Sequence, residues 1–92
     1  MYIIKVGGGR DINLEGIVTD LAQIKDPFVV VLGANALRDE LGAQLGHRKV
    51  ELTSVSGYTS VYSDADAIDL ILMAYSGLRN RRFVELCQRN GI

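Results

Sequence analysis

The stretch that decides the fold is MYIIKVGGGRD, residues 1–11. Residues 2–6 are β-branched or aromatic apart from one lysine and lead directly into three glycines, which predicts a strand that ends at a tight loop. Glycines in such a loop let backbone N–H groups approach an anion closely, and a lysine near the strand end adds a positive charge. One interpretation is a tight turn beside a solvated lysine. The other is a phosphate site made by Lys5, Gly7, Gly8 and Gly9.

Two well-known glycine motifs do not match this loop. In the Walker pattern the lysine follows the glycines into a helix, whereas Lys5 precedes them. The dinucleotide-binding pattern GxGxxG requires a further glycine where this chain has Asn13 or a neighbour of it. A minimal Rossmann-like nucleotide-binding protein therefore has only the three glycines in its favour.

A second strand and a second loop follow. Segment 12–24 has apolar residues at helical spacing after a capping Asn13, and this helix is expected to end at the turn before Pro27. Residues 28–32, FVVVL, form a continuous apolar run, as expected of a parallel strand buried on both faces, and the chain turns at 33–35. Because ligands collect beyond the carboxyl ends of parallel strands, the two loops are candidates to form one anion pocket.

The remainder of the chain predicts two helices and a hairpin. Leucines at helical spacing mark a short helix that ends at Gly46. The β-type runs 49–52 and 58–62 predict a hairpin or an extended surface flap. A long helix over 64–90 follows, with Ser63 as its N-cap.

These elements predict an α/β fold: the N-terminal part of a three-layer α/β/α sandwich with parallel core strands, a β-hairpin flap and a long C-terminal helix, in a single domain over residues 1–92. Two features predict a partner. Residues 67–75, AIDLILMAY, are apolar nearly all round the helix, which requires cover on more than one side. The chain also stops where an α/β fold normally enters its next strand, so the thin sheet keeps an open edge.

Composition argues against several classes of protein. The chain has 92 residues, 48% of them hydrophobic, and a formal net charge of -1, which is typical of a soluble globular domain and argues against nucleic-acid binding. No segment approaches the roughly 20 apolar residues of a membrane span. The single cysteine, Cys87, falls in the apolar pattern of the long helix, which predicts a buried thiol and a reducing, cytoplasmic compartment. A local excess of arginines is interpreted as a solvated helix end: Arg79, Arg81, Arg82 and Arg89.

Five stretches resemble the amino acid kinase family, which includes the N-acetylglutamate kinases and the kinases that phosphorylate aminoadipate or glutamate on an amino-group carrier protein. The stretches keep the order and spacing of the family's N-terminal domain and cover essentially the whole chain. They are IIKVGGG at 3–9, VVVLGAN at 29–35, LG at 45–46, TSVSGYTSVYSD at 53–64 and MAYSGLRNRRFVELCQRNGI at 73–92.

The resemblance implies transfer of the γ-phosphoryl group of ATP to a carboxylate, with Mg²⁺, giving an acyl phosphate in lysine or arginine biosynthesis. It makes Lys5 the catalytic residue and places the three glycines after it against the phosphoryl groups. It places the acceptor carboxylate on the backbone amides of Gly33, Ala34 and Asn35. It also implies a homodimer through the long helix 64–90 and an amino-group carrier protein as a partner.

The chain departs from the family in three places. The second loop of the family usually reads His-Gly-Gly-Gly, whereas residues 32–35 here read LGAN, so that two side chains narrow the approach to the backbone. An arginine that pairs with the acceptor carboxylate is replaced by Val61, which cannot form an ion pair. The nucleotide-binding half lies beyond residue 92, and no metal ligands are assigned within the chain.

Two hypotheses of function follow. The first is a partial kinase, inactive as this chain alone, whose nucleotide-binding half is supplied by a second chain or a longer reading frame. The second is a non-catalytic dimerisation or binding module derived from the kinase fold. Of the other candidates, His47, Asp64 and Asp66 are interpreted as structural. Tyr58 and Tyr62 on the flap are interpreted either as lining for a cleft or as packing residues.

Overall fold

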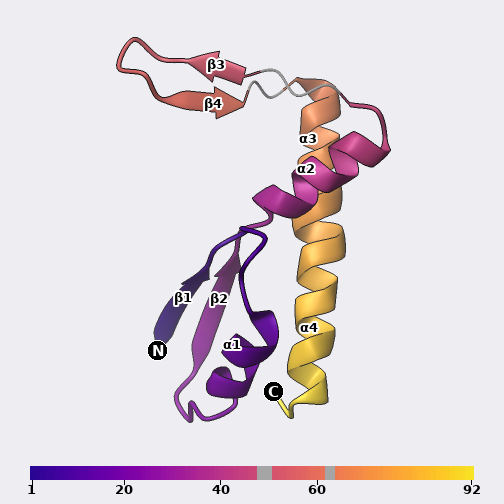
Figure 1. The fold of residues 1–92 in the computed structure, drawn as a ribbon. Coiled ribbons are helices and arrows are strands. Elements are labelled where there is room, and N and C mark those ends of the chain that lie inside the picture. Colours follow the sequence, from indigo (N-terminus) through magenta and orange to yellow (C-terminus); the bar gives the residue numbers. More distant parts are fainter. Residues whose placement is uncertain (48–50, 62–63) are drawn as a thin grey trace.

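A computed structural model describes residues 1–47, 51–61 and 64–92 of the chain. Figure 1 shows a two-stranded sheet with one short helix beside it, a long C-terminal helix along that short helix, and a separate hairpin at the far end. The predicted hairpin runs 49–52 and 58–62 extend in part beyond the described residues. The α/β character and the parallel pair are confirmed, and the structure contains one helical layer on this sheet.

The sheet pairs β1 (Tyr2–Val6) with β2 (Phe28–Leu32) in parallel, in a register from Tyr2↔Phe28 to Val6↔Leu32. Helix α1 (Leu14–Leu21) connects them. The Asn13 side chain accepts a hydrogen bond of 3.0 Å from the Gly16 N–H, which confirms the predicted N-cap. Both strands and the start of α1 therefore form where the sequence pattern places them.

The end of α1 differs from the prediction. The helix ends at Leu21 and not at the turn before Pro27. The N–H groups of Gln23 and Ile24 donate to the carbonyls three residues earlier, of Asp20 and Leu21, at 3.0 Å each, so the last turn tightens before the chain leaves the helix. The apolar spacing continues to Ile24 because this side chain still packs against the core.

The prediction that β2 is buried on both faces is wrong for this chain. Its exposure alternates: Val29 and Val31 are 49% and 46% exposed, and their neighbour Ile3 on β1 is 74% exposed. Helices α1 and α4 cover only the face that carries Ile4, Val30 and Leu32. A continuous apolar run shows that a strand is suited to burial on both faces, but residues 1–47, 51–61 and 64–92 place helices on one face of this sheet only.

Helix α2 (Asn35–Gln44) follows the second strand, and its end is confirmed at Gly46. This glycine has φ +73°, and two hydrogen bonds close the helix end, from the Gly46 N–H to the Ala43 carbonyl and from the His47 N–H to the Gly42 carbonyl. Strands β3 (Glu51–Thr53) and β4 (Thr59–Val61) then form an antiparallel hairpin, which projects away from the rest of the chain (Figure 1).

The long helix is built from α3 (Ala65–Ile71), the π-helical segment η1 (Leu72–Arg79) and α4 (Asn80–Arg89), which succeed one another without a break. Its N-cap is Asp64 and not the predicted Ser63, which lies outside the described residues. The Asp64 carboxylate accepts the Ala67 N–H at 2.8 Å, and a carboxylate is the stronger cap because it also meets the helix dipole. Gly91 stops the helix with φ +79°, as predicted.

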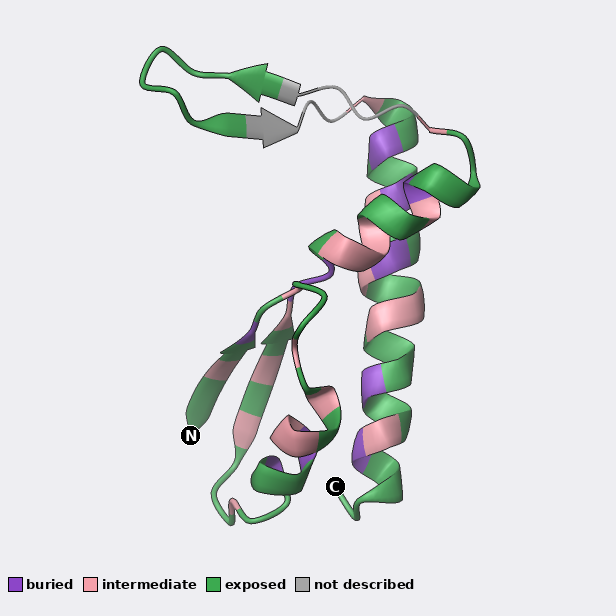
Figure 2. Ribbon diagram, viewed as in Figure 1, coloured by how far each residue is buried: buried purple, intermediate pink, exposed green. Residues whose placement is uncertain are grey.

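The hydrophobic core lies between α1 and α4 (Figure 2). Its buried members are Val18, Leu21, Phe83 and Cys87. The Cys87 thiol is buried, which confirms the prediction, and this burial raises its pKa above the ordinary value. The core therefore joins the first helix of the chain to the last.

The outer surface of the long helix remains apolar. Ile68, Leu72 and Met73 are each roughly half exposed, whereas Ala67, Leu70 and Ala74 are buried. None of the described residues covers this apolar surface. Within those residues, no helix is both long and apolar enough to cross a membrane.

The cap at Asp64 predicts a dependence of stability on pH. The Ala67 N–H, and to a smaller extent His47, hold the pKa of the Asp64 carboxyl below its ordinary value of 3.8. Because the folded-state pKa is depressed, the stabilisation is fully present above about pH 4 and is lost as the pH falls through the folded-state pKa. We expect Asp64→Ala to lower the melting temperature at pH 7 and to lower it progressively less below pH 4. Asp66→Ala, two residues further along in the first turn of the helix, is the control. If the melting temperatures of the two variants depend on pH in the same way, the assignment of Asp64 as the cap is contradicted.

Candidate functional site

The two predicted loops meet at the carboxyl ends of β1 and β2. The Gly33 N–H donates to the Val6 carbonyl at 2.8 Å, which is the last hydrogen bond of the parallel ladder. Beyond it, the Ala36 N–H at the start of α2 donates to the Gly8 carbonyl at 3.0 Å. The first loop is thus tied both to the end of the second strand and to the helix that follows it.

The contact between the loops is made by two glycines, backbone against backbone. A Cβ placed on Gly8 would overlap the backbone nitrogen of Ala34 and would lie 2.5 Å from the Gly33 carbonyl carbon. A Cβ placed on Gly33 would lie 2.7 Å from the Gly8 nitrogen. Both positions therefore need glycine for a reason of packing. A Cβ on Gly9 would meet nothing within 4 Å, so this neighbour is in open space.

Lys5 reaches the same place from β1. Its Nζ would lie 3.2 Å from a Cβ built on Gly33, so the ammonium group sits beside the second loop. Lys5 is exposed, and it forms no hydrogen bond or ion pair with any residue that the structure describes. A positive charge without a protein partner thus lies next to the junction of the two loops.

The long helix supplies two side chains to this junction from η1. Arg79 donates from Nε to the Gly33 carbonyl at 3.2 Å and from a terminal nitrogen to the Gly7 carbonyl at 3.3 Å. The Tyr75 hydroxyl donates to Oδ1 of Asn35 at 2.6 Å. One element therefore holds both loops at once.

The sequence reasoning missed Arg79, because it grouped this arginine with the others as a charged helix end. A signal was available. The dipole of a helix acts within its last turn, whereas Arg79 lies ten residues before the end of α4 at Arg89. An arginine in the middle of a half-buried helix requires a polar partner, and the two loop carbonyls are that partner.

The predicted acceptor loop differs in accessibility along its length. Gly33 and Ala34 are buried, and Asn35 is exposed. The Ala34 methyl group is enclosed by the protein, and the Asn35 side chain is turned toward η1 by Tyr75. The Ala34 side chain is thus enclosed by the protein, whereas Asn35 is the part of the loop that solvent reaches.

A shallow cavity of about 270 Å³ lies beside the first loop. Its lining includes Gly8, Gly9, Arg10, Arg79 and Arg82, with Glu40 as the carboxylate opposite Arg10 at 3.8 Å. The excess of arginine over carboxylate makes the surroundings of the glycine loop electropositive, which favours anionic ligands.

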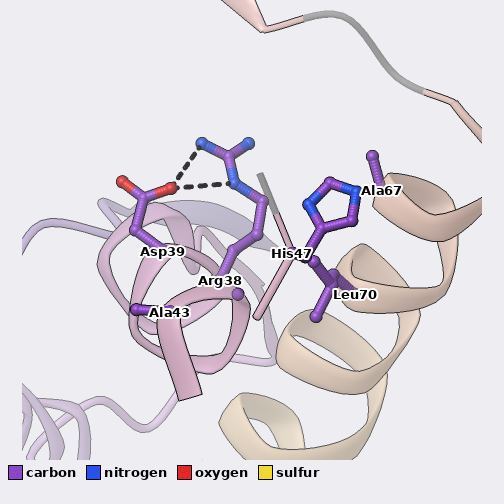
Figure 3. Close-up of a pocket in the computed structure, with 7 residues that line it drawn as sticks. Arg38, Asp39, Ala43, His47, Ala67 and Leu70 are labelled. Carbon is purple, nitrogen blue, oxygen red and sulfur yellow. Dashed lines mark hydrogen bonds and ion pairs between the residues drawn. The ribbon is translucent and has the colours of Figure 1, made fainter. Parts of the chain in front are cut away.

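A second cavity, of about 240 Å³, lies between α2 and α3 (Figure 3). Arg38 and Asp39 form an ion pair of 3.3 Å on one side of it. His47 on the other side contacts the Asp64 carboxylate at 3.4 Å, which ties the end of α2 to the start of α3. Among the described residues no group of three or more His, Cys, Asp or Glu side chains could hold a metal ion. The Asp64 carboxylate thus both caps α3 and contacts His47.

The hairpin supplies little to the site as the structure describes it. Tyr58 is 78% exposed, and the Val61 side chain and Tyr62 lie outside the described residues.

Comparison with known proteins identifies relatives along the whole chain, although no family model matches it. The [LysW]-aminoadipate kinase of Deinococcus radiodurans is 34% identical over 95 aligned residues, which include all of this chain and 32% of the relative. The [LysW]-aminoadipate kinase of Thermus thermophilus is 35% identical over 99% of this chain and 35% of the relative. The acetylglutamate kinase of Cytophaga hutchinsonii is 32% identical over 98% of this chain and 33% of the relative. The chain thus spans about one third of the length of the curated relatives that it matches.

Proposed function

We propose that this chain, a member of the amino acid kinase family, forms the phosphoryl-binding edge of an ATP-dependent carboxylate kinase. The chain is about one third as long as its relatives. The observation that carries the proposal is the position of the Lys5 ammonium group beside the junction of the two glycine loops. The lysine, the loops and their contact come from neighbouring parallel strands, where an α/β fold places its ligands.

The residues at the junction suit a phosphoryl group. The charge of Lys5 is unpaired within the described residues, and a cationic group opposite phosphoryl oxygens offsets the negative charge that they carry. Gly7 and Gly9 are exposed, so their backbone can approach an anion without obstruction by a side chain. Lys5 and the amides of Gly7, Gly8 and Gly9 are therefore proposed to hold the transferred phosphoryl group.

The proposed reaction follows from these contacts and from the relatives, which are named as kinases of [LysW]-aminoadipate and acetylglutamate. A carboxylate oxygen of the acceptor attacks the γ-phosphorus of ATP, the bond from that phosphorus to the bridging oxygen breaks, and ADP leaves with the electron pair. The acceptor carboxylate is proposed to lie on the backbone of 33–35, entered from the exposed Asn35. ATP with Mg²⁺ is implied by the family, but the described residues hold no carboxylate set for a metal. No step through the metal is assigned to this chain.

We expect Lys5→Met to weaken phosphate binding by at least about tenfold, because a charge-assisted hydrogen bond contributes roughly 1.5–3 kcal/mol. The measurement is a titration of the labelled chain with inorganic phosphate and then with ATP, followed by the amide NMR signals of Gly7, Gly8 and Gly9. Lys25→Met is the matched control, since Lys25 is an exposed lysine in the turn before β2. Phosphate that shifts only signals remote from the loops, or that binds Lys5→Met as tightly as the unaltered chain, would contradict the proposal.

Turnover is a separate part of the proposal. We propose that the chain alone does not transfer a phosphoryl group to aminoadipate or glutamate, because Lys5 and the loops supply only part of the contacts that phosphoryl transfer needs. ADP release in the presence of either acceptor, abolished by Lys5→Met, would overturn this part and establish a complete kinase.

The second candidate function is a dimerisation or binding module, and the exposed apolar surface of the long helix favours it. Ile68, Leu72 and Met73 form that surface, and a homodimer through helix 64–90 would cover it. A second chain that carries a nucleotide-binding half, and an amino-group carrier protein, are the other partners that the family suggests. A chain that sediments as a dimer and binds neither phosphate nor ATP would establish the module in place of the kinase segment.

A further inference from the structure

We infer that Arg79 is a positioning residue that sets the peptide planes of both glycine loops and so aims their N–H groups at the anion. This inference rests on the proposed function of the loops and adds a residue from the long helix to the site. Nothing in the arrangement of β1 and β2 alone would provide this control, because it comes from a side chain 46 residues after Gly33 and 72 residues after Gly7.

Arg79 takes the place of the next donor in the parallel ladder of β1 and β2. In a parallel pair, the hydrogen bond that follows Gly33 N–H to Val6 C=O would run from the Gly8 N–H to the Gly33 carbonyl. In this structure the Gly33 carbonyl accepts from Nε of Arg79 at 3.2 Å. No acceptor for the Gly8 N–H occurs among residues 1–47, 51–61 and 64–92. Arg79 thus ends the ladder one bond early, which leaves the Gly8 N–H available to a ligand.

The planarity of the peptide bond then sets the direction of the loop N–H groups. In a trans peptide the C=O of one residue and the N–H of the next point in opposite directions. Because Arg79 draws the Gly7 carbonyl toward η1, the Gly8 N–H points away from that helix. Because it draws the Gly33 carbonyl the same way, the Ala34 N–H also points away. The α2 N–H of Ala36 fixes the Gly8 carbonyl, and with it the direction of the Gly9 N–H.

An arginine suits this role better than a lysine does. A guanidinium group presents several donors in a rigid plane, so one arginine can serve two carbonyls on two different loops. A lysine ammonium is a compact charge that lacks this fork. The π-helical segment also carries Tyr75, whose hydroxyl donates to Oδ1 of Asn35 in the second loop at 2.6 Å. Short π-helical stretches occur frequently at functional sites, in keeping with this use.

The experiment compares Arg79→Met and Arg79→Lys with the unaltered chain, and with Arg81→Met as the matched control on the same helix. The first measurement needs no ligand: hydrogen exchange of the two hydrogen-bonded amides at the junction of the loops, Gly33, which donates to the Val6 carbonyl, and Ala36, which donates to the Gly8 carbonyl. We expect these amides to exchange at least about tenfold faster in Arg79→Met, while the core amides of Val18 and Phe83 keep their protection. Arg79→Lys is expected to restore this protection only in part.

The second measurement is the titration with inorganic phosphate. We expect Arg79→Met to weaken binding by about tenfold at unchanged core protection, with Arg79→Lys between the two and Arg81→Met equal to the unaltered chain. Loop amides that exchange at the same rate in Arg79→Met and Arg81→Met would overturn the inference. Faster exchange of the loop amides in Arg79→Met together with an unchanged phosphate affinity would also overturn the inference. Arg79 would then stabilise the loops without directing their N–H groups toward the anion.

The two proposals fail in different ways. If the unaltered chain binds no phosphate, the proposed function is wrong, and the exchange rates alone decide whether Arg79 sets the loop geometry. If the unaltered chain binds phosphate through Lys5 and Arg79→Met binds equally well, the proposed function stands and the role of Arg79 is wrong.

Discussion

Replacing Gly8 with alanine is expected to separate the two loops and to destabilise the chain by about 3 kcal/mol, at the upper end of what overpacking costs. The added Cβ would overlap the Ala34 nitrogen and lie 2.5 Å from the Gly33 carbonyl carbon and 2.6 Å from the Asn35 nitrogen. These are backbone atoms at the start of α2, so no rotation of a side chain can relieve the overlap. Thermal unfolding followed by circular dichroism measures the effect, with an expected fall in melting temperature of more than about 10 °C for a domain of this size.

Gly9→Ala is the matched control for this prediction. A Cβ on Gly9 meets nothing within 4 Å, and the φ angle of Gly9 is not positive, so alanine fits there without strain. We expect the melting temperature of Gly9→Ala to equal or slightly exceed that of the unaltered chain, because alanine restricts the unfolded chain more than glycine does. Equal destabilisation by the two substitutions would show that the loops do not touch in solution as they do in the structure.

Replacing Phe83 with alanine is expected to cost about 3–5 kcal/mol, the range for truncation of a large buried aromatic side chain. Phe83 is 6% exposed and joins α4 to Val18 and Leu21 of α1. A chain of this length has an unfolding free energy of roughly 5–15 kcal/mol, so the substitution removes a large fraction of the total. The midpoint of unfolding in urea, followed by far-ultraviolet circular dichroism, measures the loss.

Val84→Ala is the control that separates the loss of core packing from the effect of alanine on helix propensity. Val84 is the next residue on the same helix and is 44% exposed. We expect a change within about 0.5 kcal/mol, because it lies outside the core and alanine is the better helix former. A Phe83→Ala midpoint close to that of Val84→Ala would mean that α4 is not packed on α1, and the role of Arg79 would fall with it, since the same helix carries both.

Local patterns in the sequence predicted the individual elements well. The apolar run before Gly7 and the one before Gly33 mark two strand ends, and Asn13 marks the start of α1, because each depends on residues that are neighbours in the chain. The helix ends at Gly46 and Gly91 were predicted for the same reason, and both glycines have the positive φ angle that this role requires.

The errors concern properties that depend on what packs around an element. Strand β2 has the composition of a strand covered on both faces, but Val29 and Val31 are half exposed, because composition does not show which layers are present. The cap of the long helix was assigned to Ser63, since serine and aspartate both suit this position and stand side by side. The hydrogen bond from the Ala67 N–H to the Asp64 carboxylate shows that Asp64 is the N-cap.

The sequence by itself determined the strands, the glycine loops, the lysine beside them and the family, because these features are recorded in adjacent residues and in their spacing. Only the tertiary structure decided that Gly8 and Gly33 touch through their backbones and that Arg79 holds both loops. The physical reason is separation along the chain. A hydrogen bond between residues 46 or 72 positions apart leaves no periodic trace in the sequence, and it forms only when the packing of α4 on α1 has brought the long helix against the loops.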